Sequence, residues 1–135
     1  MIDIIDLLWL MKKNGASDLH LVVGSSPMVR VNGSLVPVDN MEPLTPEEIS
    51  ETFVRLTTPE QREKFHSTLE LDFGYTFPGV GRFRCNAAQQ RGAISFALRF
   101  LPPVIASIDE LELPDICKEL ALRPRGLVIV TGPRL

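Results

Sequence analysis

The stretch Val80-Gly-Arg-Phe-Arg-Cys-Asn-Ala-Ala-Gln-Gln90 is followed by Arg91-Gly92 and then by Ala93-Ile-Ser-Phe-Ala-Leu-Arg-Phe-Leu101. Apolar and polar side chains alternate through both long segments, which is typical of β-strands with one buried face. If Arg91-Gly92 is a two-residue turn, the two apolar faces coincide and Arg84 lies directly opposite Arg99, whereas a longer loop would shift this register. The stretch therefore predicts an antiparallel hairpin.

The segments before this hairpin mix helical and strand patterns rather than alternating them. Asn32-Gly33 is a strong hairpin signal, and Thr45 and Thr58 each begin a capping box with proline at the first helical position. We expect helices at 3–14 and after each capping box, and strands at 19–23, 28–31, 35–38 and 71–77. This order predicts an α+β fold with a mainly antiparallel sheet and flanking helices.

A second segment follows Pro102-Pro103, which interrupts the sheet pattern. We assign residues 1–101 to an amino-terminal domain, 102–106 to a linker and 107–135 to the start of another domain, in which Pro114 opens a short helix ending near Leu122. The apolar run 127–130 is typical of a strand buried in a parallel sheet. Because that sheet is missing from this chain, we expect the run to be ordered by pairing with an exposed sheet edge or with a second copy.

Gly132-Pro133 resembles the opening of a phosphate-binding loop, G-x-x-x-x-G-K-[ST]. Arg134-Leu135 follows, so the loop lysine, second glycine and hydroxyl are absent from the sequence. We expect this chain by itself to be inactive as an ATPase and to have no bound nucleotide.

Composition excludes several classes of function. The 135 residues carry a net charge of −3, which favours neither nucleic acid nor an anionic membrane, and no apolar run is long enough to span a bilayer. Cys85 and Cys117 fit no metal-ligand or redox spacing, so we expect two free thiols in a reducing cytoplasm. No cluster of metal ligands stands out.

Three arginines are predicted on the polar face of the hairpin, namely Arg82, Arg84 and Arg99. Like charges directly opposite on a sheet destabilise it by a few tenths to about 1 kcal/mol, so the cluster needs a countercharge. One candidate is a phosphate, whose oxygens match guanidinium groups. The other is a nearby carboxylate for each arginine, such as Glu70 or Asp72 of the neighbouring strand.

Two further sets of residues have alternative interpretations. Asp18 and His20 share the less apolar face of their strand, and we expect a solvent-facing or capping pair rather than a catalytic dyad. A group of aromatic side chains either fills the core or lines a pocket for a small ligand: Phe73, Phe77, Phe83, Phe96 and Phe100.

Four segments together resemble the amino-terminal part of the PilT-like type IV pilus retraction ATPases, within the secretion ATPase superfamily. They are Ala16-Ser-Asp-Leu-His-Leu21, Pro27-Met-Val-Arg-Val-Asn-Gly33, Pro78-Gly-Val-Gly-Arg-Phe-Arg-Cys-Asn86 and Arg123-Pro-Arg-Gly-Leu-Val-Ile-Val-Thr-Gly-Pro133. Their order and spacing agree over nearly the whole chain. The closeness of Asn14 to Met1 favours the retraction type over the assembly type, which generally carries an additional preceding domain.

The resemblance implies a PAS-like domain linked to a RecA-like core, of which 107–135 would be the beginning. It implies a cytoplasmic hexamer that powers twitching motility at the inner-membrane platform of the pilus, uses ATP and Mg²⁺, and neither binds nucleic acid nor inserts into the membrane. It further implies that Arg82, Arg84 and Arg99 contact the ATP phosphates. The alternatives are a free-standing PAS-like sensor of a small ligand and the equivalent domain of a pilus assembly or type II secretion ATPase.

Overall fold

The structure, a computed structural model, describes residues 2–133. The chain divides into two compact units whose boundary lies between Pro103 and Val104. Arg134 and Leu135, where the sequence departs from the phosphate-binding loop pattern, lie outside the described residues.

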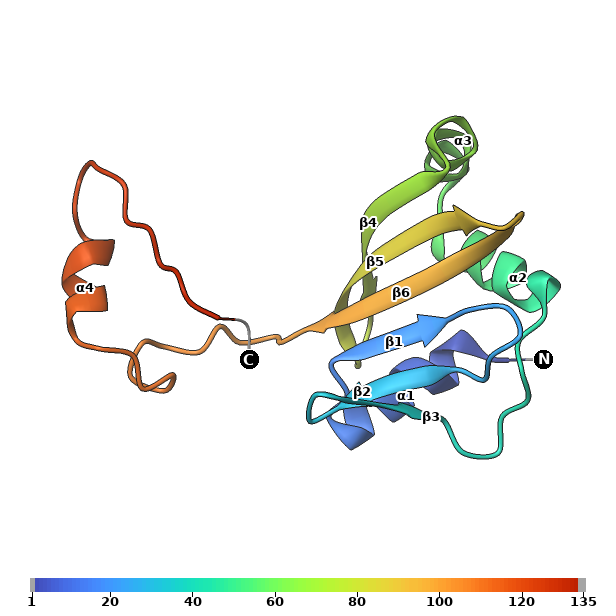
Figure 1. Ribbon diagram of the computed structural model, residues 1–135, viewed down its shortest axis with the longest axis horizontal. Coiled ribbons are helices and arrows are strands. Elements are labelled where there is room, and N and C mark those ends of the chain that lie inside the picture. Colours follow the sequence, from blue (N-terminus) through green and yellow to red (C-terminus); the bar gives the residue numbers. More distant parts are fainter. Residues whose placement is uncertain (1, 134–135) are drawn as a thin grey trace. The chain divides into compact units, whose positions relative to one another are not determined.

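The first unit is built on one six-stranded sheet (Figure 1). The strands lie in the order β3-β2-β1-β6-β5-β4, and every neighbouring pair is antiparallel. Their bounds are β1 Asp18–Leu21, β2 Met28–Val31, β3 Ser34–Pro37, β4 Glu70–Phe77, β5 Gly81–Gln90 and β6 Ala93–Leu101. The order brings the first strand of the chain beside the last. Asp18 and Arg99, which are 81 residues apart in the sequence, therefore become neighbours in the sheet.

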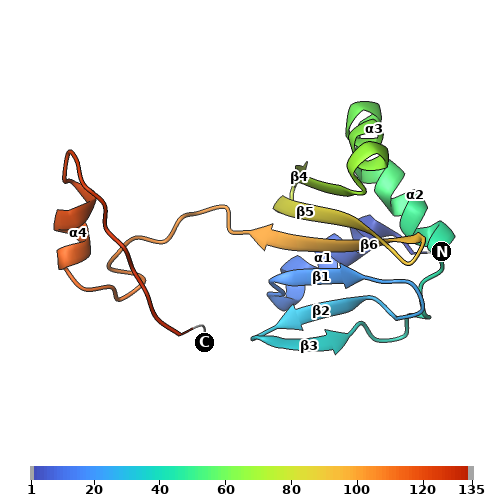
Figure 2. The same cartoon turned by 45° about the horizontal axis from the view of Figure 1, so that its top comes forward.

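Three helices cover one face of this sheet (Figures 1 and 2). They are α1 Ile4–Asn14, α2 Pro46–Leu56 and α3 Pro59–Thr68. Asp3 caps α1, and Thr45 and Thr58 form complete capping boxes with Glu48 and Gln61, as their spacing predicts. The mixed α+β fold with an antiparallel sheet and flanking helices is thus confirmed.

The core lies between the sheet and the helices. Phe96 of β6 packs against Phe53 of α2 and Phe73 of β4, with ring centroids 6.1 and 6.0 Å apart, while Phe83 packs against Phe100 at 5.3 Å. Phe77 contacts Trp9 instead. The phenylalanines therefore pack against other aromatic side chains, which favours the core-filling interpretation over a ligand pocket.

Two short turns determine the strand registers. Asn32-Gly33 and Arg91-Gly92 both adopt positive φ at the two central positions, as a type I′ turn requires. The second turn gives the predicted register, in which Arg84 pairs with Arg99. Phe83, Cys85 and Ala87 consequently face the helices, and the arginines face the opposite side.

The second unit contains one helix among its described residues, α4 Ile116–Ala121. Ser107 and Glu110 exchange hydrogen bonds in the turn before it. The expected strand at 127–130 is absent, and the prediction that the run pairs with a sheet edge of this chain is wrong: its side chains are 55% to 92% exposed. Pairing with a second copy stays a prediction. A strand of a parallel sheet needs hydrogen-bonding neighbours, and the described residues provide none here. Gly132-Pro133 lies in the same irregular, exposed segment.

The two cysteines differ in burial. Cys85 is fully buried in the sheet, and burial raises the pKa of its thiol to about 12, whereas Cys117 is partly exposed. We expect a thiol reagent at pH 8 to label Cys117 rapidly and Cys85 only after unfolding in urea, because the thiolate is the reactive form. Peptide mass spectrometry measures both rates in one sample. Equal labelling rates in the folded chain would contradict the burial of Cys85.

Among the described residues, no helix is long and apolar enough to cross a membrane.

Candidate anion-binding site

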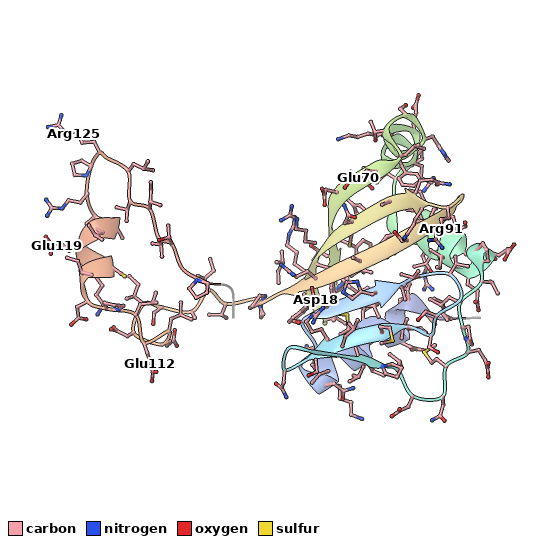
Figure 3. All side chains as sticks on the ribbon, viewed as in Figure 1. Asp18, Glu70, Arg91, Glu112, Glu119 and Arg125 are labelled. Atoms are coloured by element: carbon pink, nitrogen blue, oxygen red, sulfur yellow. The ribbon has the colours of Figure 1, made fainter. Side chains whose placement is uncertain are left out.

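A row of charged residues crosses the face of the sheet that the helices leave uncovered. The pairing register places Arg30 of β2 opposite Asp18 of β1, Asp18 opposite Arg99 of β6, and Arg99 opposite Arg84 of β5. We call these four residues the charged row. Figure 3 shows Asp18 at the start of β1, beside β6, with the turn residue Arg91 at the other end of β5 and β6. The row therefore places Asp18 between Arg30 and Arg99, with Arg84 one strand further along.

Asp18 is the residue of this site that the sequence prediction misplaced. We expected a solvent-facing or capping pair with His20, but Asp18 is only 7% exposed. Its carboxylate accepts hydrogen bonds from the Ser17 hydroxyl at 2.8 Å and from Arg99 Nε at 3.0 Å, and Arg30 Nε lies 3.6 Å away. The one available signal was an aspartate at the start of a short strand with two leucines, since a charge that becomes buried there needs a partner.

The ionisation of Asp18 reflects opposing effects. Burial by itself raises the pKa, but the hydrogen bonds from Ser17 and Arg99 and the nearby positive charges lower it, and the net result is a pKa below the ordinary aspartate value. Asp18 is therefore a carboxylate at neutral pH. Its interactions stabilise the fold above the ordinary pKa and lose this contribution as the pH falls through the lowered one.

The other two predicted site residues have different surroundings. Arg82 donates a hydrogen bond to Thr76 Oγ1 at 3.2 Å, and its guanidinium lies across Gly74, where a Cβ would come within 2.6 Å of Nη2. Arg84 is exposed, and among residues 2–133 no hydrogen bond or ion pair engages its side chain. Arg84 thus keeps its donors available.

The carboxylates of β4 do not neutralise these arginines. Glu70 and Asp72 instead accept hydrogen bonds from Asn86 Nδ2, at 3.3 and 3.2 Å. Glu70 and Asp72 are therefore wrong as the partners of these arginines. Of Arg82, Arg84 and Arg99, only Arg99 pairs with a carboxylate, that of Asp18, which Arg30 also approaches. The reason is geometric: Asn86 lies directly opposite Asp72 in the register, whereas Arg84 lies opposite Gly74.

A shallow pocket of about 310 Å³ lies beside the charged row. Its lining includes Arg82 and Arg84 together with Asp72, Gly74 and Leu101. Guanidinium groups bind phosphate oxygens through paired, charge-assisted hydrogen bonds. The arrangement can therefore bind an anion that approaches from the uncovered face. Among the described residues, no group of three or more His, Cys, Asp or Glu side chains is placed to hold a metal ion.

Comparison with known proteins identifies similar sequences and similar folds. The chain is 39% identical over 131 residues to the type IV pilus retraction ATPase PilT of Pseudomonas aeruginosa, and 41% identical over 126 residues to the type IV pilus ATPase PilU of the same species. These matches cover 97% and 93% of the chain but 38% and 33% of the two relatives. The chain thus spans less than two fifths of the length of either relative. No family model matches.

Solved structures of related ATPases have folds similar to that of this chain. A crystal structure of the pilus retraction motor PilT with bound ADP superposes with a TM-score of 0.82 at 37% identity, covering 98% of this chain and 39% of that one. The ATPase DotB of Legionella pneumophila gives a TM-score of 0.63 at 26% identity, covering 90% and 34%.

Proposed function

The chain matches the amino-terminal region of the PilT-like type IV pilus ATPases over nearly its whole length, and from this premise we propose that it is the nucleotide-sensing domain of a pilus retraction motor. In this proposal the uncovered face of the sheet meets ATP held by the motor's RecA-like core. Arg84, Arg99 and Arg82 then donate hydrogen bonds to the phosphate oxygens. The complete motor works as a cytoplasmic hexamer at the inner-membrane platform of the pilus, with ATP and Mg²⁺ as its nucleotide and metal.

The observation that carries the proposal is the exposed, unpartnered side chain of Arg84, opposite Arg99, among the described residues. Two guanidinium groups held opposite each other without a shared countercharge repel each other and destabilise the sheet. An anion bound between them removes this repulsion, which favours its binding. The triphosphate of ATP suits these residues, because Arg82 and Arg84 line one pocket and Arg99 lies opposite Arg84 on a face that no helix covers. They supply contacts to phosphate, while the adenine and Mg²⁺ need residues of the core.

The alternatives have less support. A free-standing sensor of small ligands needs a pocket between the sheet and the helices, but Phe73, Phe83 and Phe96 are buried there in aromatic contacts. The equivalent domain of an assembly or secretion ATPase would have a similar fold, and the ATPase DotB shows that this fold is not confined to PilT. The higher identity and TM-score with PilT favour the retraction type.

Protection of arginines from chemical modification tests the proposal. A protein that carries this region together with an ATPase core is treated with phenylglyoxal, with and without a non-hydrolysable ATP analogue, and modified arginines are quantified by mass spectrometry. We expect the analogue to protect Arg84 and Arg99. Arg91 is the matched control, because it is an exposed arginine of the same sheet at the turn, away from the charged row. Equal modification of Arg84 with and without nucleotide would overturn the proposal.

A further inference from the structure

The Asp18 carboxylate binds the Nε atom of Arg99 and leaves the two terminal nitrogens of the Arg99 guanidinium without a partner among the described residues. Arg99 Nε donates to Asp18 Oδ1 at 3.0 Å, and among the described residues neither terminal nitrogen of Arg99 makes a hydrogen bond. The Arg99 side chain is 62% exposed, whereas that of Asp18 is 10% exposed. The carboxylate therefore fixes the inner edge of the guanidinium, while the two Nη groups remain free to donate to a ligand.

The position of Asp18 is itself firmly fixed. The backbone N–H of Ser17 donates to the Arg30 carbonyl on one side, and the N–H of Phe100 donates to the Ser17 carbonyl on the other, both at 2.9 Å. The Ser17 hydroxyl and Arg30 engage the second oxygen of Asp18. A carboxylate held by two neighbouring strands is a rigid support, which is what an arginine needs in order to meet a phosphate in one geometry.

The like charge of Arg84 makes this support necessary. Arg84 lies directly opposite Arg99, so their mutual repulsion favours conformations in which the two guanidinium groups move apart. A separated pair cannot bind the same phosphate. Asp18 counters the repulsion from the other side of Arg99, at a distance that does not occupy the nitrogens facing the ligand.

We propose that Asp18 is a positioning residue, which orients Arg99 through Nε so that Arg99 and Arg84 together present their terminal nitrogens to the phosphates of a nucleotide. This inference rests on the proposed function, because it assigns the ligand of Arg99 to the same nucleotide. It extends the site from the three arginines to a buried acidic residue that does not touch the ligand. Asp18 acts on the nucleotide only through Arg99.

A double-mutant cycle tests this dependence. ATP turnover is measured for a protein that carries this region and an ATPase core, with Asp18→Asn, Arg99→Ala and both changes. We expect Asp18→Asn alone to lower kcat by roughly 10- to 100-fold, the range that corresponds to losing one hydrogen bond to a charged group. In the Arg99→Ala background the same change has almost no further effect. A purely structural role predicts instead the same loss in both backgrounds, which would overturn the proposal.

The outcomes separate this inference from the proposed function. If Arg99→Ala leaves turnover unchanged, the nucleotide contact of Arg99 is wrong and the role of Asp18 falls with it. If Arg99→Ala lowers turnover and Asp18→Asn does not, the proposed function stands and only the positioning role is overturned. Asp18→Glu, which keeps the charge but displaces it by one methylene, is expected to recover part of the activity.

A measurement on the unmodified chain covers the case in which Asp18→Asn fails to fold. The Nε–Hε group of Arg99 has a carboxylate acceptor, whereas that of Arg91 has no hydrogen-bond partner among the described residues. We therefore expect the Arg99 Nε–Hε signal to exchange with water at least about tenfold more slowly than that of Arg91 in NMR at neutral pH, since hydrogen-bonded protons are protected. Equal exchange rates would overturn the geometry on which the inference depends.

Discussion

Arg84→Ala is expected to lower the ATP turnover of a complete motor carrying this region by about 10³- to 10⁵-fold, the range known for arginines that stabilise phosphoryl transfer. Among the described residues Arg84 has no hydrogen-bond or ion-pair partner, so its removal breaks no such interaction. Its removal also relieves the repulsion with Arg99, worth a few tenths to about 1 kcal/mol. Activity should therefore collapse while the melting temperature stays near that of the parent protein.

Two variants make this result specific. Arg91→Asn removes an exposed positive charge from the same sheet and places at positive φ a residue that tolerates it, so turnover should be unchanged. Arg99→Ala should also lower turnover severely, but unlike Arg84→Ala it should lower the melting temperature, because it deprives the buried carboxylate of Asp18 of its closest arginine. Turnover is normalised to folded hexamer measured by size-exclusion chromatography. Near-normal turnover of Arg84→Ala with a reduced melting temperature would show that Arg84 is structural.

Much of the hairpin that carries the site was predictable because its determinants are local. The alternation in β5 and β6 assigns each side chain to a face, and the two residues at Arg91-Gly92 leave one register in which both apolar faces agree. The helix starts were predictable for the same reason, since each capping box lies within four consecutive residues. Local sequence pattern is thus sufficient to place Arg84 opposite Arg99.

The partner of Arg99 was not predictable from such patterns. It depends on β1 lying beside β6, and strand order in a sheet is decided by packing between segments distant in sequence. When the strand order is unknown, the sequence suggests that Asp18 forms a polar pair with His20, and that Glu70 and Asp72 are the nearest countercharges. The strand predicted at 127–130 is absent for a related reason. The apolar pattern is typical of a strand in a parallel sheet, but the described residues supply no neighbouring strand for it.

Phe96→Ala is expected to destabilise the first unit by about 3–5 kcal/mol, which is a large part of the roughly 5–15 kcal/mol that holds a domain folded. Phe96 is 2% exposed and contacts both Phe53 of α2 and Phe73 of β4, so it joins the sheet to the helical layer. Its removal leaves a cavity that strands of a continuous sheet cannot close, because their spacing is fixed by hydrogen bonds.

Urea denaturation followed by circular dichroism measures the loss, with Phe100→Ala as the matched control. Phe100 lies on the same strand and the same face but is only partly buried, and its ring contact is with Phe83 at the end of the sheet. Because less apolar surface is removed from contact, its replacement should cost clearly less than that of Phe96. Equal costs at the two positions would mean that the helical layer is not anchored through Phe96. We also expect Phe96→Ala to disturb the geometry of the charged row, because Arg99 lies three residues further along the same strand.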